Sequence, residues 1–114
     1  MPPDIKILKL DTLPTAASEL YKPSSTDPKQ TAIVQNMRFT NIGSGTSKFH
    51  LFFVKSGGTY ANDARRIVPK ELAIPTGYTV IDDDQLTLGS GDAIWGYIDT
   101  GTVDYAIFGS ERPA

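Results

Sequence analysis

Apolar and polar residues alternate most clearly near the C-terminal end of the chain, between residues 86 and 111. Two short runs, Ala93 to Ile98 and Val103 to Phe108, send successive side chains to opposite faces. A period of two is typical of β-strands, whereas a helix repeats its apolar positions every three or four residues. Asp99 to Thr102 joins the runs, and Gly101 within it can adopt a positive φ without strain. This stretch therefore predicts an antiparallel β-hairpin.

Shorter runs of the same period occur upstream, in residues 32–41, 48–55, 78–81 and 86–88, with Gly-rich and Asp-rich turns between them. Residues 48–55 carry apolar or aromatic side chains on both faces. Such a strand is either central in a sandwich or covered by a partner subunit, and the sequence leaves both alternatives open. In residues 60–72 a short helix and an irregular connection are equally compatible with the spacing.

Together these runs predict an all-β fold, namely an antiparallel β-sandwich of six to eight strands, either jelly-roll-like or Ig-like. The sandwich domain is expected over residues 31–114, and residues 1–30 are expected to form an extended N-terminal arm, because they contain five of the eight prolines. Within the arm, Ile5 to Leu10 alternates and is a candidate edge strand. The residues predicted to form the core are Phe39, Trp95, Tyr97, Tyr105 and Ile107.

Composition narrows the class of protein. The 114 residues fit one domain, and the absence of cysteine excludes disulfides and thiolate metal sites. A net charge of -2 argues against nucleic-acid binding, and the longest apolar runs are far shorter than the ~20 residues that a membrane span needs. We find no secretory signal pattern at the N-terminus.

Charge is divided unevenly along the chain. Residues 32–71 carry six basic and two acidic residues, whereas residues 72–114 carry one basic and seven acidic residues. The two parts can differ in sign by chance, through their solvated turns, or because they make complementary contacts between subunits. The second alternative, together with the two apolar faces of residues 48–55, predicts a homo-oligomer, such as a ring. The residues expected at interfaces are Ile5, Ile7, Leu8, Leu10, His50, Phe52, Arg65 and Arg66.

Candidate chemistry is sparse. His50 is the only histidine, and its phenylalanine neighbours favour a position at the core edge or in an interface over a catalytic role. Asp82 to Asp84 offers hard oxygen ligands but lacks the order of an EF-hand loop, which favours a solvated acidic turn over a calcium site. We therefore predict neither enzyme activity nor a bound metal or cofactor.

Aromatic residues leave one binding function open. Trp95, Tyr97 and Tyr105 recur at strand spacing, which favours core packing. The alternative is a flat aromatic platform for sugar rings, with Asp92 or Asp104 beside it. The alternative function is then a carbohydrate-binding or receptor-binding β-sandwich module.

Four segments carry a resemblance beyond spacing: TAIVQNMRFTN at residues 31–41, residues 65–72, LTLGSGDAIWGY at residues 86–97 and VDYAIFGSE at residues 103–111. The chain resembles a group of small proteins encoded among the virion genes of tailed bacteriophages. The resemblance covers about residues 31–111 and carries no catalytic residues. It implies a virion structural protein made in the bacterial cytoplasm, either a capsid decoration (cement) protein or a tail, neck or baseplate component. The partners that it implies are the major capsid protein or tail proteins, and the analogy with decoration proteins favours a trimer among the possible homo-oligomers.

Overall fold

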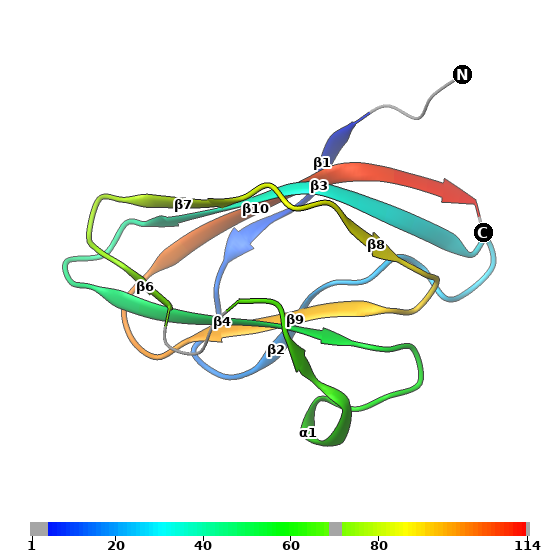
Figure 1. Cartoon of the computed structure of the whole chain (residues 1–114), viewed down its shortest axis with the longest axis horizontal. Helices are drawn as coiled ribbons and strands as arrows, with labels where there is room; N and C mark the ends of the chain where they lie inside the picture. Colours follow the sequence, from blue (N-terminus) through cyan, green and yellow to red (C-terminus); the bar gives the residue numbers. More distant parts are fainter. Residues whose placement is uncertain (1–4, 69–71, 114) are drawn as a thin grey trace.

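The computed structural model describes residues 5–68 and 72–113 of the chain. Two antiparallel five-stranded sheets pack face to face, so the predicted all-β sandwich is confirmed (Figure 1). Sheet A consists of β1 (Lys6–Thr12), β10 (Val103–Pro113), β3 (Gln30–Asn41), β7 (Thr79–Asp82) and β8 (Leu86–Leu88). Sheet B consists of β2 (Ser18–Tyr21), β9 (Ala93–Ile98), β4 (Ser47–Val54), β5 (Arg65–Arg66) and β6 (Leu72–Ile74).

The described residues form ten strands, where six to eight were expected. The difference comes from elements such as β5 and β6, which have two and three residues and are too short to leave an alternating pattern in the sequence. The connection between β4 and β5 contains α1 (Tyr60–Asp63), a single helical turn. Thr59 caps it by accepting a hydrogen bond from the backbone N–H of Asn62.

Sheet A is organised around the pair β3 and β10, the two longest strands. Their register runs from Val103 opposite Asn41 to Pro113 opposite Gln30, with a bulge between Phe108 and Gly109. A side chain at Gly109 would overlap the carbonyl oxygen of Ile33, so the bulge needs glycine there. On its other edge, β3 pairs with β7 through its C-terminal half and with β8 through its N-terminal half.

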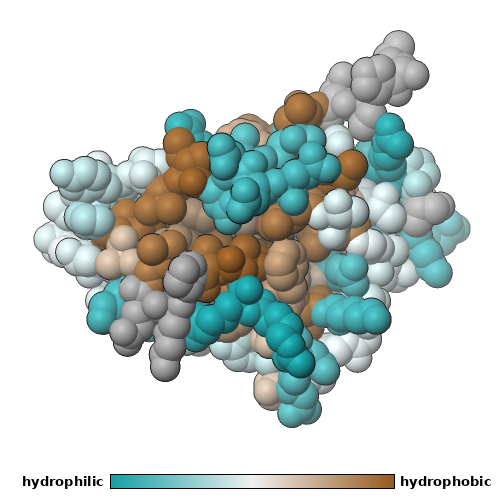
Figure 2. All heavy atoms as spheres, viewed as in Figure 1, coloured by the Kyte–Doolittle hydropathy of each residue, from teal (hydrophilic) through white to brown (hydrophobic). Residues whose placement is uncertain are grey.

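The core lies between the sheets, and Figure 2 shows apolar residues as a band between the two layers. Phe39 of sheet A packs against Phe49 of sheet B with ring centroids 4.8 Å apart, and its ring stacks on Tyr105 at 6.4 Å. Phe39, Tyr105 and Ile107 are buried there, as the alternating pattern predicts.

The N-terminal segment is part of the sandwich. β1 pairs with β10 at one edge of sheet A, as expected for the candidate edge strand, and β2 pairs with β9 in sheet B. Leu13, Leu20 and Tyr21 are buried in the core. The expected arm over residues 1–30 is therefore wrong for residues 5–30, because Pro14, Pro23 and Pro28 lie in the connections between strands and leave the strands free to pair. Residues 1–4 lie outside the described residues.

Candidate binding surfaces

The outer face of sheet B is aromatic. Trp95 lies opposite Phe52, and Tyr97 lies opposite His50, on the face of β9 and β4 that points away from the core. The inward positions of β9 are taken by Ile94, Gly96 and Ile98. Position 96 requires glycine, since a Cβ there would lie 2.7 Å from the carbonyl oxygen of His50 on the neighbouring strand and 2.9 Å from side-chain atoms of Leu20 and Leu51.

The assignment of Trp95 and Tyr97 to the core is therefore wrong, because both are half-buried on the outer face. The physical reason is that a period of two gives two sets of side chains and does not say which set points inward. Both sets of β9 are apolar or aromatic, and the fully buried set is the aliphatic one with Ile94 and Ile98.

Five rings form a continuous group on this face, the outer aromatic cluster. The His50 and Tyr97 rings stack at 4.4 Å, and the Tyr60 and Trp95 rings stack at 5.4 Å with 17° between their planes. Phe52 connects the two pairs, edge-on to Tyr60 at 5.2 Å and parallel to Tyr97 at 6.2 Å. The members of the cluster are His50, Phe52, Tyr60, Trp95 and Tyr97.

The cluster explains why both faces of residues 48–55 are apolar. Tyr60 comes from α1, so the connection between β4 and β5 folds over the outer face of sheet B. His50 and Phe52 are only 4% and 7% exposed beneath it. Since the chain itself covers this face, the two apolar faces no longer argue for a partner subunit here.

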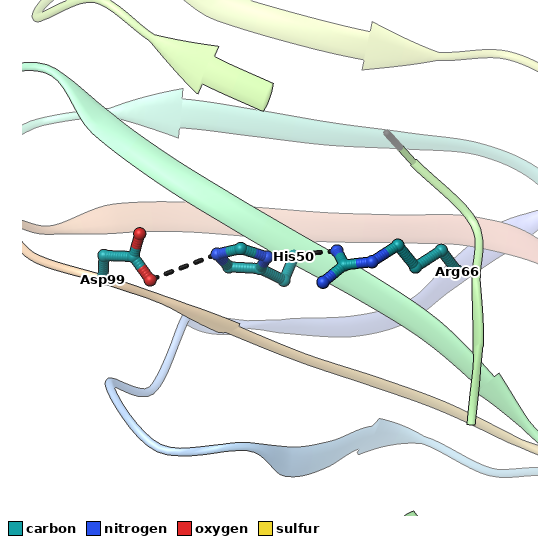
Figure 3. A network of polar contacts seen from close by, with 3 residues as sticks. All are labelled: His50, Arg66 and Asp99. Atoms are coloured by element: carbon teal, nitrogen blue, oxygen red, sulfur yellow. Dashed lines mark hydrogen bonds and ion pairs between the residues drawn. The ribbon is translucent and has the colours of Figure 1, made fainter. Parts of the chain in front are cut away.

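His50 lies between two charged side chains (Figure 3). Its Nε2 is 3.1 Å from Oδ1 of Asp99, and its Nδ1 is 3.2 Å from Nη1 of Arg66. A guanidinium only donates hydrogen bonds, so Nδ1 accepts and Nε2–H donates to the carboxylate. His50 is thus held as the neutral Nε2–H tautomer.

Arg66 also packs on the cluster, with its guanidinium carbon 4.8 Å from the centre of the Phe52 ring. The Arg66 side chain on β5 thus contacts two residues of the neighbouring strand β4, His50 and Phe52. The Arg66 guanidinium and the Asp99 carboxylate lie at opposite sides of the buried His50 imidazole. Among the described residues, no group of three or more His, Cys, Asp or Glu side chains is arranged to hold a metal ion.

The acidic turn after β7 has the local structure of an Asx turn. The backbone N–H of Asp84 donates to Oδ1 of Asp82 over 3.1 Å, and Asp83 and Asp84 are exposed.

The outer face of sheet A is mixed: exposed aliphatic side chains lie among threonine and asparagine, and few of its residues are charged. On β10 the core residues Tyr105 and Ile107 alternate with Asp104, Ala106 and Phe108, which point outward. Adjacent strands continue three rows of residues across this face. The rows, read from β1 through β10 and β3 to β7, are Thr12, Asp104, Thr40 and Thr79; then Leu10, Ala106, Arg38 and Ile81; then Ile7, Phe108 and Asn36.

Three large aliphatic side chains on this face are more than half exposed, namely Leu10 at 60%, Ile81 at 53% and Ile7 at 52%. A depression of about 370 Å³ lies beside Leu10 and is lined in part by Arg38, Ala106 and Phe108. Arg38 and Asp104 are the only charged residues in the three rows. Water-facing antiparallel sheets usually carry polar and charged residues on this side, so the exposed Ile7, Leu10 and Ile81 are the exceptions on this face.

The residues expected at interfaces do not form one surface. Ile5, Ile7 and Leu10 are exposed on or beside the outer face of sheet A. Leu8 packs partly against the core, since a bulge between Ile7 and Lys9 displaces the alternation of β1. His50 and Phe52 lie buried in sheet B, at the other face of the sandwich, with Arg65 and Arg66 exposed beside them.

Sequence reasoning missed Ile81, Phe108 and Tyr60 as surface residues. The signal for the first two was present, because each alternates with core residues along its strand. That Leu10 and Arg38 lie on the same face as Ile81 and Phe108 can be inferred only when the pairing of β1, β10, β3 and β7 is known.

No family model matches this chain, and a search of curated proteins gives no match either. Within the described residues, no helix has the length and hydropathy needed to cross a membrane.

Proposed function

We propose that this protein is a structural subunit of a tailed-bacteriophage virion, most simply a capsid decoration protein that stabilises the head. A tail, neck or baseplate position is the alternative within the same class. The observation that carries the proposal is the outer face of sheet A, where Ile7, Leu10 and Ile81 are each more than half exposed and only Arg38 and Asp104 carry charge in the three rows. Depletion of charge around large apolar side chains is typical of the buried centre of a protein interface.

The free energy available on this face is substantial. Burying apolar surface contributes about 25 cal/mol per Å², and fully burying one exposed Leu or Ile side chain contributes about 1.5–3 kcal/mol. An assembly repeats such a contact in every subunit. The resemblance of residues 31–111 to virion proteins of tailed phages supplies the class of assembly.

The edge of sheet A offers a second means of attachment. β1 is the terminal strand of the sheet and carries the exposed residues Ile7 and Leu10. An edge strand can pair with an extended segment of another chain, so a capsid or tail protein can add a strand beside β1. In this proposal the protein is made in the bacterial cytoplasm and then incorporated into particles.

Virion incorporation tests the proposal. Purified particles should contain the protein by mass spectrometry, and Ile81→Lys should reduce its incorporation several-fold. Ile42→Lys is the matched control, because Ile42 is 57% exposed but lies in the turn after β3, outside the three rows. Absence of the protein from purified virions, or equal incorporation of both variants, would contradict the proposal.

A second candidate function is carbohydrate binding by the outer aromatic cluster. It is favoured by the Tyr60 and Trp95 rings, which are nearly parallel and half-buried at the surface of sheet B. Tyr105, considered with them from the sequence, lies in the core and takes no part. Because Trp95 is the only tryptophan, its fluorescence reports on this site alone. Titration with bacterial cell-wall oligosaccharides should change the emission, and an unchanged spectrum would remove this candidate.

A further inference from the structure

We infer that the outer face of sheet A packs against the same face of a second copy of the chain, which gives a twofold-symmetric dimer. The inference deepens the proposed function and rests on it, because it names the partner of the face that carries the proposal. The argument comes from the order of residues in one row of the sheet. That row is Leu10, Ala106, Arg38 and Ile81, on β1, β10, β3 and β7.

A twofold axis parallel to the strands, placed between two facing sheets, reverses the strand order and keeps the rows in line. Leu10 of one copy then faces Ile81 of the other, and the same contact recurs at the other end of the row. Both side chains are more than half exposed in the single chain, at 60% and 53%. Two symmetric aliphatic contacts therefore flank the centre of the interface, as an isologous arrangement requires.

The centre of the row is complementary in size. Ala106 faces Arg38 of the second copy, and Arg38 faces Ala106. The small Ala106 side chain lies in the depression of about 370 Å³, between Leu10, Arg38 and Phe108. The same operation therefore places the longest side chain of the row over the space left by the shortest.

The two charges of the face are also complementary across the axis. Arg38 forms no salt bridge among the described residues, and the Asp104 carboxylate accepts a hydrogen bond from Oγ1 of Thr12 over 2.8 Å. Asp104 lies two residues before Ala106 on β10, in the adjacent row. The Arg38 guanidinium of the second copy faces Ala106 and is therefore one row from the Asp104 carboxylate. Each interface thus contains two Arg38–Asp104 pairs, whose carboxylates offset the repulsion between the two Arg38 guanidinium groups near the axis, and charge-assisted pairs of this kind fix the register of an interface.

A self-complementary row distinguishes a second copy from an unrelated partner. A virion protein would need its own aliphatic, acidic and small residues in the matching order, whereas a second copy has that order already. The twofold arrangement leaves the outer edge of β1 and the outer aromatic cluster of sheet B uncovered. Attachment to a capsid or tail protein can therefore occur from the same dimer.

Sedimentation of the full chain across protein concentrations tests the inference. The unsubstituted protein should form dimers, Ile81→Lys should weaken dimerisation at least about tenfold, and the matched control Ile42→Lys should not. Arg38→Asp and Asp104→Arg should each weaken the dimer, and the double variant should recover most of the loss, because it restores opposite charges across the axis. Circular dichroism and thermal unfolding of each variant establish that it folds.

A monomer at every concentration, or a double variant as weak as its parents, would overturn the inference. The chain could instead be monomeric and present in virions, with Ile81→Lys still incorporated less than the unsubstituted protein. The face would then be covered by a virion protein, so the inference would fail and the proposed function would stand. If the dimer forms but purified virions lack the protein, the proposed function fails and the dimer stands.

Discussion

Tyr21 donates its hydroxyl hydrogen to Oε2 of Glu111 over 2.7 Å and thereby joins an edge strand of sheet B to β10 of sheet A. The other carboxylate oxygen, Oε1, lies 3.2 Å from Nζ of Lys6 on β1. Burial of the phenol, and then its hydrogen bond to the carboxylate, raise the pKa of Tyr21 well above its usual range. The Glu111 carboxylate on β10 therefore binds side chains of both β1 and β2, the two strands of the N-terminal segment.

We expect Tyr21→Phe to lower the free energy of unfolding by about 1–3 kcal/mol, because it removes a partly buried hydrogen bond to a charged acceptor. Urea unfolding measures the change. Tyr78→Phe is the control, since Tyr78 is 64% exposed, and it should alter stability by less than about 0.5 kcal/mol. Equal unfolding midpoints for Tyr21→Phe and the unsubstituted protein would show that the contact contributes nothing.

The N-terminal segment should be needed for folding. Leu20 is 4% exposed in the core, so we expect Leu20→Ala to cost about 2–5 kcal/mol. Ile5→Ala truncates an aliphatic side chain of the same segment that is 63% exposed and lies outside the three rows, and it should cost less than about 0.5 kcal/mol. Thermal and urea unfolding compare the two. Similar small losses for both would restore the interpretation of residues 1–30 as an arm outside the fold.

Adjacent residues of β9 allow the two faces of sheet B to be compared directly. Ile94 is fully buried, and we expect Ile94→Ala to cost about 2–5 kcal/mol. Trp95→Ala removes a larger side chain but should cost less, about 1–2 kcal/mol, because the half-buried ring loses mainly its stacking on Tyr60. Urea unfolding ranks the variants. A greater loss for Trp95→Ala would mean that the outer aromatic cluster stabilises the fold more than the inward face of β9.

The fold class could be predicted because strands of six or more residues leave a clear period of two. The run from Ala93 to Ile98 and the run from Val103 to Phe108 became β9 and the start of β10. They do not pair with each other as the predicted hairpin required, since β9 belongs to sheet B and β10 to sheet A. A tight turn signal fixes the position of a bend, but it does not decide whether the next strand returns to the same sheet or crosses to the other.

The candidate surfaces could be predicted only in part, because they depend on pairing between distant segments. Leu10 and Ile81 share a row only through Ala106 and Arg38, over four strands. The His50, Arg66 and Asp99 contacts likewise come from three separate segments. Periodicity identifies the face on which a residue lies relative to its neighbours in one strand, and register supplies the rest.

Alkaline pH should destabilise the protein, and Tyr105 should account for part of the effect. Burial, and then the nearby Asp11 charge, raise the pKa of Tyr105 to about 12, whereas an unfolded tyrosine titrates near 10. Below about pH 10 the phenol is protonated in both states and the stability is unaffected. Between about pH 10 and 12 the unfolded chain loses this proton first, so the free energy of unfolding falls as pH rises.

We therefore expect the urea midpoint of the unsubstituted protein to decrease over this range, and Tyr105→Phe to decrease less. The ring of Tyr105 packs on Phe39, and phenylalanine keeps that contact, so the two proteins should have similar stability at neutral pH. Tyr21 also gains a raised pKa on folding and is present in both proteins, so some alkaline sensitivity should persist in the variant. Parallel curves for the two proteins above pH 10 would show that the Tyr105 hydroxyl titrates alike in the folded and unfolded chains.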